Sequence, residues 1–142
     1  AASDVYKRQD CGLAALAMLF RDKASITTSV AALDNLAAVL IDPTTARHRR
    51  DGYSVSELQT LAGAFAYSLQ ARNLTLEAFY KRSFPLIAWI DPGNGGHFTL
   101  VEEVTGTSIA LADPSRGRLA IPTQSWRELW LQETTGIVLE LE

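Results

Sequence analysis

The chain has 142 residues, of which 47% are hydrophobic and 20% charged, and its formal net charge is −3. These values fit one globular domain with a buried core and argue against the basic surface that nucleic-acid binding needs. The longest apolar runs, 13–20 and 84–90, are far shorter than the ~20 residues that cross a bilayer, so we expect no membrane span. A single cysteine excludes an internal disulfide, which fits the cytoplasm; the periplasm and association with a membrane through a transporter stay open.

The first half of the chain favours helices. Residues 1–9 show no periodicity and are interpreted as a lead that need not be native, followed by a single domain over 10–142. Apolar spacing predicts helices over about 11–21, 27–40 and 55–66. Asp10 is the expected N-cap of the first helix, and Ser54 with Glu57 forms a capping box at the third.

The second half favours strands. We expect them at 67–71, 85–90, 97–104, 108–112, 118–121 and 136–141. Thr75 is predicted to cap a short helix over 76–80, and Thr123 to cap a helix that turns Trp126 and Trp130 toward the core. Helices followed by an antiparallel sheet indicate an α+β fold.

Cys11 opens the first predicted helix and is followed by Gly12, which leaves room for a substrate backbone. A helix start and a neighbouring imidazolium both stabilise a thiolate, the nucleophilic form of cysteine. Cys11 is therefore a candidate nucleophile. The alternative is a buried structural cysteine, which is the commoner fate of a lone cysteine.

His97 and Asp113 are the candidate partners of this thiol. His97 begins a predicted strand after Gly95 and Gly96, which suits the rim of a cleft, and Asp113 ends the next strand before Pro114. The alternatives are a surface histidine and an ordinary turn-forming aspartate.

The hairpin loop between these two strands decides whether their side chains meet. A three-residue loop at 105–107, with Gly106 left-handed, places Thr99 opposite Asp113 and His97 diagonal to Asp113 on the same face. A two-residue loop would put His97 and Asp113 on opposite faces. The pairing therefore requires the odd-length loop or an equivalent bulge.

Four segments together resemble the bacteriocin-processing, double-glycine leader peptidases. Residues 10–18 resemble the nucleophile motif of that family, 95–98 its histidine motif and 112–117 its aspartate motif, while 135–140 resemble its closing strand. The resemblance covers nearly the whole chain from residue 10 onward.

This resemblance implies a papain-like fold, with N-terminal helices packed on a C-terminal antiparallel sheet, and hydrolysis of a peptide bond after Gly-Gly in a leader peptide. It implies Cys11 as nucleophile, His97 as general base and Asp113 as the residue that orients the imidazole. A membrane peptide exporter is the partner of many relatives. A cleft that admits only glycine would be flanked by three residues, Gly12, Gly95 and Gly96.

The chain departs from the family pattern before the cysteine. Relatives usually carry a glutamine five or six residues upstream that helps to form the oxyanion hole, where this chain has Val5 and Tyr6. The nearest glutamine, Gln9, is the candidate for that donor. The chain lacks a phosphate-binding glycine-rich loop, and 50–54 resemble a helix start found in the stand-alone members, so we expect that type.

Two other classes of function stay open at this point. One is a non-catalytic domain that binds leader peptides. The missing upstream glutamine favours this alternative, and the presence of Cys11 argues against it. The other is a related amidase or acyl transferase. No cofactor is expected, and we expect no metal site from two distant histidines and one cysteine. The basic run at 47–50 would suit an acidic peptide or a phosphate, or be a solvated loop.

Overall fold

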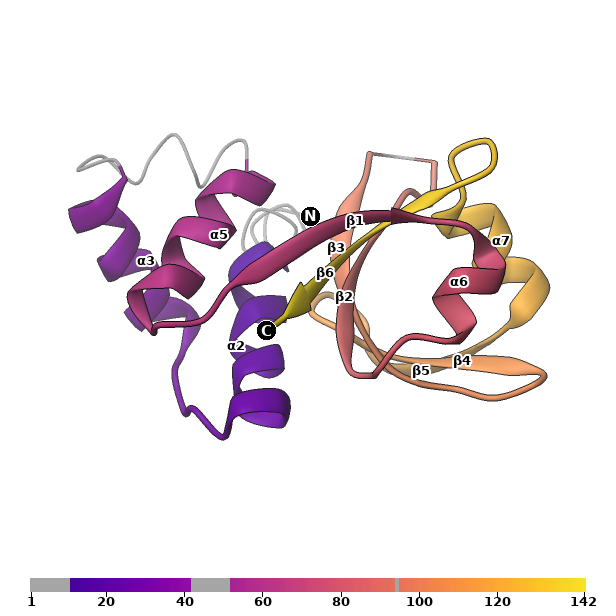
Figure 1. Ribbon diagram of the computed structural model, residues 1–142, viewed down its shortest axis with the longest axis horizontal. Coiled ribbons are helices and arrows are strands. Elements are labelled where there is room, and N and C mark those ends of the chain that lie inside the picture. Colours follow the sequence, from indigo (N-terminus) through magenta and orange to yellow (C-terminus); the bar gives the residue numbers. More distant parts are fainter. Residues whose placement is uncertain (1–10, 42–51, 94) are drawn as a thin grey trace.

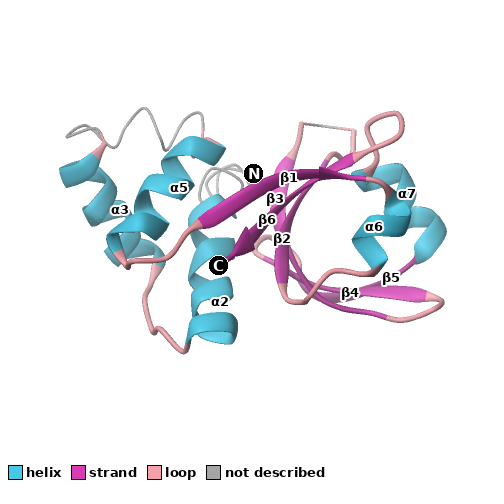
Figure 2. Cartoon of the chain, in the orientation of Figure 1, coloured by secondary structure: helices cyan, strands magenta, loops and turns pink. Residues whose placement is uncertain are grey.

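The computed structural model describes residues 11–41, 52–93 and 95–142. Among these residues, three helices come first, and strands with two further helices follow (Figures 1 and 2). In chain order the elements are α2 (Cys11–Ala24), α3 (Val30–Leu40), α5 (Val55–Ala64), β1 (Leu69–Leu74), α6 (Leu76–Tyr80), β2 (Leu86–Ile90), β3 (His97–Val104), β4 (Ser108–Asp113), β5 (Gly117–Pro122), α7 (Thr123–Trp130) and β6 (Gly136–Leu141). The α+β prediction is confirmed.

The caps explain where the N-terminal helices begin. The Ser29 side chain accepts a hydrogen bond from the Ala32 amide at 3.0 Å, so α3 starts at Val30 and not at the predicted residue 27. The predicted capping box of α5 is present, with both hydrogen bonds between Ser54 and Glu57. The proposed Asp10 cap, the lead 1–9 and the basic run 47–50 lie outside the described residues.

The six strands form one antiparallel sheet in the order β1-β6-β2-β3-β4-β5. The last strand of the chain therefore lies inside the sheet, between β1 and β2. Two local predictions were wrong. The first strand covers Leu69–Leu74 instead of 67–71, and α7 has Pro122 at its N-cap position with no side-chain cap from Thr123.

The β3–β4 hairpin reaches the predicted register by another route. Val104 lies opposite Ile109, so the loop is longer than the predicted three residues, and Gly106 is not left-handed. A bulge between Val101 and Glu103 then shifts the register, and Leu100 lies opposite Ala112. Continuing the ladder brings Thr99 opposite Asp113, as the pairing of His97 with Asp113 requires.

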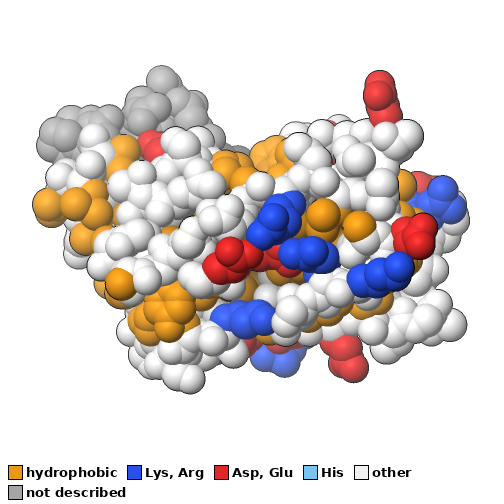
Figure 3. All heavy atoms as spheres, viewed as in Figure 1, with side chains coloured by type: hydrophobic (Ala, Val, Ile, Leu, Met, Phe, Trp, Pro, Cys, Tyr) orange, Lys and Arg blue, Asp and Glu red, His pale blue; other side chains and the backbone are white. Residues whose placement is uncertain are grey.

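Charged side chains bridge the β1–β6 edge of the sheet. Glu140 accepts hydrogen bonds from Arg72 at 2.7 Å and from Arg82 at 2.7 and 2.9 Å, and Glu142 accepts one from Arg72 at 2.6 Å. Acidic and basic side chains gather near the middle of the face in Figure 3.

No helix in the described parts of the chain combines the length and the apolarity that crossing a bilayer requires.

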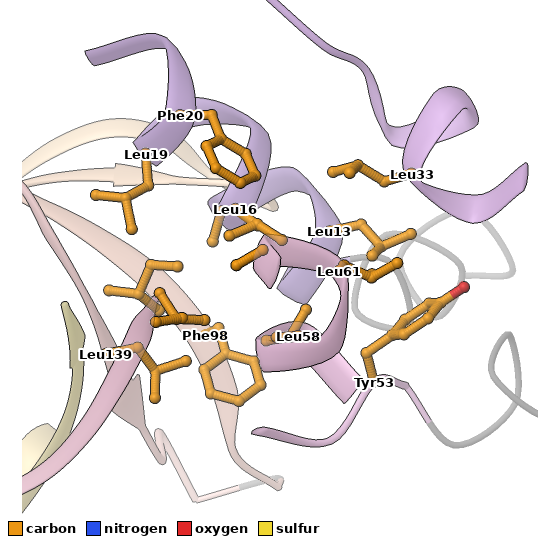
Figure 4. Packing of buried hydrophobic residues seen from close by; sticks show 14 of the residues in the cluster. Leu13, Leu16, Leu19, Phe20, Leu33, Tyr53, Leu58, Leu61, Phe98 and Leu139 are labelled. Atoms are coloured by element: carbon orange, nitrogen blue, oxygen red, sulfur yellow. The ribbon is translucent and has the colours of Figure 1, made fainter. Parts of the chain in front are cut away.

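Two apolar clusters hold the fold together. In the first, side chains of α2, α3 and α5 pack against one face of the strands, where Phe98 and Leu139 lie (Figure 4). In the second, α6 and α7 pack against strand residues on the other face of the sheet, such as Val101 and Leu111. The prediction that Trp126 and Trp130 face the core is confirmed, since both are fully buried.

Candidate active site

Cys11 is the first residue of α2 and is 5% exposed. The apolar stripe of α2 packs this helix against β3, which brings its start to the start of that strand. The backbone amide of Phe98 donates a hydrogen bond to the Cys11 sulfur over 3.4 Å. The sulfur therefore lies beside the residue that directly follows His97.

His97 and Asp113 form a buried hydrogen-bonded pair. Nε2 of His97 lies 3.0 Å from Oδ2 of Asp113, and their side chains are 4% and 1% exposed. A neutral imidazole that donates from Nε2 carries its lone pair on Nδ1, where it can accept a proton. The strand positions hold this pair, because β3 and β4 are neighbours in the sheet.

Asp113 has a structural task as well. Its Oδ1 accepts hydrogen bonds from the amides of Ser115 at 2.9 Å and Arg116 at 3.1 Å, which close the turn into β5. Gly117 completes this turn with a φ of 80°, a conformation that favours glycine. One carboxylate oxygen thus shapes the turn while the other holds the histidine.

The environment keeps Asp113 ionised. Burial by itself raises the pKa of a carboxyl group, but the hydrogen bonds from His97 and from the Ser115 amide outweigh burial, and the pKa of Asp113 lies below its ordinary value of 3.8. Near neutral pH the carboxylate is therefore an acceptor for the imidazole and stabilises its protonated form.

The predicted site residues fall into three groups. Cys11, His97 and Asp113 converge where α2 meets the start of β3 and the end of β4. Gly95 is left-handed, with a φ of 99° and open space where a side chain would be, whereas Gly12 faces Phe98 and Leu58 in the core. Gln9 lies outside the described residues.

An apolar pocket of about 250 Å³ opens beside Phe98. Trp89 packs against the first cluster but is only half-buried, and it lines this pocket. The pocket could not be predicted, since its walls come from segments that lie far apart in the chain. They are Tyr53, Ser54, Val55, Trp89, Phe98 and Ile137.

Within 11–41, 52–93 and 95–142, no group of three or more histidine, cysteine or acidic side chains could hold a metal ion. The chemistry that these described residues offer is proton transfer and nucleophilic attack at the start of α2.

Residues 4–141 match the Peptidase C39 family. The chain belongs to this family. No curated protein sequence matches the chain significantly. The predicted family and the predicted papain-like peptidase fold are thus confirmed.

Solved structures show the same fold. A double-glycine-motif protease from an AMS/PCAT transporter, in complex with a leader peptide, is 22% identical with a TM-score of 0.70, over 94% of this chain and 84% of that one. The peptidase domain of Streptococcus ComA, a bifunctional ABC transporter of a quorum-sensing pathway, is 18% identical with a TM-score of 0.75, over 94% and 90%. The N-terminal C39-like domain of a toxin secretion ATP-binding protein from Vibrio parahaemolyticus is 16% identical with a TM-score of 0.66, over 94% and 96%.

Proposed function

We propose that this C39 protein is a cysteine peptidase that cleaves the bond after Gly-Gly in a leader peptide. Cys11 is the nucleophile, His97 the general base and Asp113 the residue that orients the imidazole. The observation that carries the proposal is the buried 3.0 Å contact between His97 and Asp113, one residue from the amide that contacts the Cys11 sulfur.

The proposed reaction is acyl transfer in two steps. His97 Nδ1 takes the proton of the Cys11 thiol, and the thiolate attacks the scissile carbonyl carbon. The leaving amine receives that proton from His97, and the leader remains on Cys11 as a thioester. A water molecule, deprotonated by His97, then hydrolyses the thioester and regenerates the thiol.

Backbone N–H groups supply stabilisation for both anions of this reaction. The Phe98 amide already contacts the sulfur and would favour the thiolate over the thiol. The Cys11 amide lies at the start of α2, where the backbone N–H groups and the helix dipole favour negative charge. We assign it to the oxyanion, with Gln9 as the second proposed donor.

The substrate proposal rests on the family and on the cleft. One structural relative comes from a transporter and was solved with a leader peptide, and another is a domain of an ABC transporter, so we propose a leader peptide as substrate and a membrane peptide exporter as partner. The open side of Gly95 suits a peptide backbone without side chains. The apolar pocket beside Phe98 suits an apolar side chain of the same peptide.

Cleavage of a synthetic double-glycine leader peptide tests this function by mass spectrometry. We expect the wild type to cut after Gly-Gly, and Cys11→Ala or His97→Ala to lower kcat by about 10⁶-fold, as loss of a nucleophile or its base does in a serine peptidase. Circular dichroism controls for folding. Binding without cleavage would support the non-catalytic alternative, and release of ammonia from a side-chain amide would support an amidase.

A further inference from the structure

Trp89 contacts the residues on both sides of His97. A methyl group at Gly96 would lie less than 3.0 Å from Cζ2, Cε2 and Nε1 of the Trp89 indole, so this ring lies directly against the Gly96 backbone. The same ring packs edge-on against Phe98, with ring centroids 4.9 Å apart and an interplanar angle of 67°. Only glycine fits at 96 while the indole holds this place.

The pairing of β2 with β3 holds the backbone that carries the Trp89 ring. Trp89 lies opposite Phe98, and the neighbouring Ile90 lies opposite His97 in the β2–β3 register. A ring on this strand position therefore keeps its place relative to the start of β3. Phe98 in turn carries the amide that donates to the Cys11 sulfur.

The segment that leads into His97 has few other restraints among its described residues. Gly93 and Gly95 are both left-handed, with open space around their α-carbons, and the Asp91 carboxylate accepts from the Gly93 amide at 2.8 Å. No side chain of 95 or 96 can anchor the backbone. The indole contact at Gly96 supplies the restraint next to the histidine.

We propose that Trp89 is a positioning residue: by stacking on Gly96 and Phe98 it fixes the backbone of His97, and through it the imidazole relative to Cys11. The inference rests on the proposed function, because that function requires the imidazole to be aligned with Cys11. A displacement of about 1 Å in such a group can cost a hundredfold in rate.

The chain contains a matched control for this contact. A methyl group at Gly136 would lie less than 3.0 Å from Cε2, Cδ2 and Cζ2 of Trp130, so a second indole is stacked on a second glycine. Trp130 is fully buried in the second apolar cluster, and its Nε1 donates to the Ile137 carbonyl at 3.0 Å. Changes there should lower stability without moving His97.

The test compares the two stacks through the reactivity of the single cysteine. Alkylation of Cys11 by iodoacetamide is followed against pH in the wild type, in Trp89→Phe with Trp130→Phe, and in Gly96→Ala with Gly136→Ala. This readout needs no peptide, so a change in the pocket wall alone does not affect it. kcat, KM and thermal midpoints are measured on the same variants.

We expect the wild-type alkylation midpoint to lie below the value of about 8.5 for an ordinary thiol, because imidazolium stabilises the thiolate. Trp89→Phe and Gly96→Ala should raise this midpoint and lower kcat, Gly96→Ala by up to about a hundredfold. Trp130→Phe and Gly136→Ala should lower the thermal midpoint and leave the alkylation midpoint unchanged.

Two other results have distinct meanings. A shifted wild-type midpoint that stays the same in folded Trp89→Phe, or that moves equally in Trp130→Phe, would overturn the role of Trp89 alone. A wild-type midpoint equal to that of an ordinary thiol would overturn the proposed function, and the role of Trp89 with it. Trp89→Phe is the milder change and decides the matter if Gly96→Ala does not fold.

Discussion

The helical region, α2, α3 and α5, and the strand region contribute to the site in different ways. The helical region buries apolar side chains and offers one reactive atom, the sulfur at its first described residue. The buried polar side chains of the described chain are all on strands: His97, Thr99, Asp113 and Glu140. A helix start can present a single group, whereas two groups that must bond to each other are held better by neighbouring strands, since register sets their separation. The helical region therefore supplies the sulfur, and the strand region supplies the pair of His97 and Asp113.

The strongest test of this division removes the carboxylate that only the strand region supplies. Asp113→Ala leaves Nε2 of His97 without its acceptor, and we expect kcat to fall by about 10⁴-fold, as for the orienting aspartate of a serine peptidase. Asp113→Asn keeps only one oxygen, which the Ser115 and Arg116 amides require, so its amide nitrogen would face Nε2 and we expect a loss of similar size. Rates are measured per folded molecule, because Asp113 also closes the turn before β5. Equal rates in the alanine variant and the wild type would remove Asp113 from the mechanism.

Substitutions in the two apolar clusters test whether the free energy of unfolding can be lowered in each region without a change in kcat. Phe20 packs against Phe65 at 4.8 Å in the first cluster, and Phe79 packs against Trp130 at 4.7 Å in the second. Truncating either to alanine should lower the free energy of unfolding by about 3–5 kcal/mol, measured by urea denaturation. Neither ring belongs to the site, so kcat per folded molecule should stay the same. A selective loss of kcat in Phe20→Ala would show that the first core also tunes the cysteine.

Acidification should weaken the strand region through its buried carboxylates. Burial raises the pKa of Glu140, but hydrogen bonds from Arg82 and Arg72 outweigh it, and the pKa lies below 4.5. The pKa of Asp113 is lowered as well. A carboxyl group with a lowered folded pKa stabilises the protein above its unfolded pKa, and that contribution is lost as the pH falls through the folded value.

The measurement is urea denaturation at several pH values from 6 down to about 3. The stability difference between the wild type and Glu140→Gln should shrink as the pH falls. Glu142→Gln is the matched control, because that side chain is 52% exposed and should matter less. A difference that stays constant with pH would mean that the ion pairs of Glu140 do not stabilise the folded state.

Local signals explain which parts of the fold could be predicted. The strands at 97–104 and 136–141 and the helix at 76–80 have the predicted bounds, because apolar pattern and adjacent turn residues define them. The bulge at Glu102 could not be predicted, since it depends on how β3 pairs with β4 and not on a local sequence signal. The candidate site residues were predictable by type and order. The indole on Gly96 was not, because this contact joins β2 to the residue before β3 and depends on tertiary packing.

Trapping the covalent intermediate tests the central claim most directly. The wild type and Cys11→Ala are mixed with a double-glycine leader peptide, quenched in acid within one turnover and analysed by intact-protein mass spectrometry. The account predicts that the wild-type mass rises by that of the acyl leader ending in Gly-Gly, attached to Cys11 as a thioester, and that the His97→Ala protein accumulates none. Cleavage by the Cys11→Ala protein, or turnover by the wild type with the leader attached elsewhere, would contradict it.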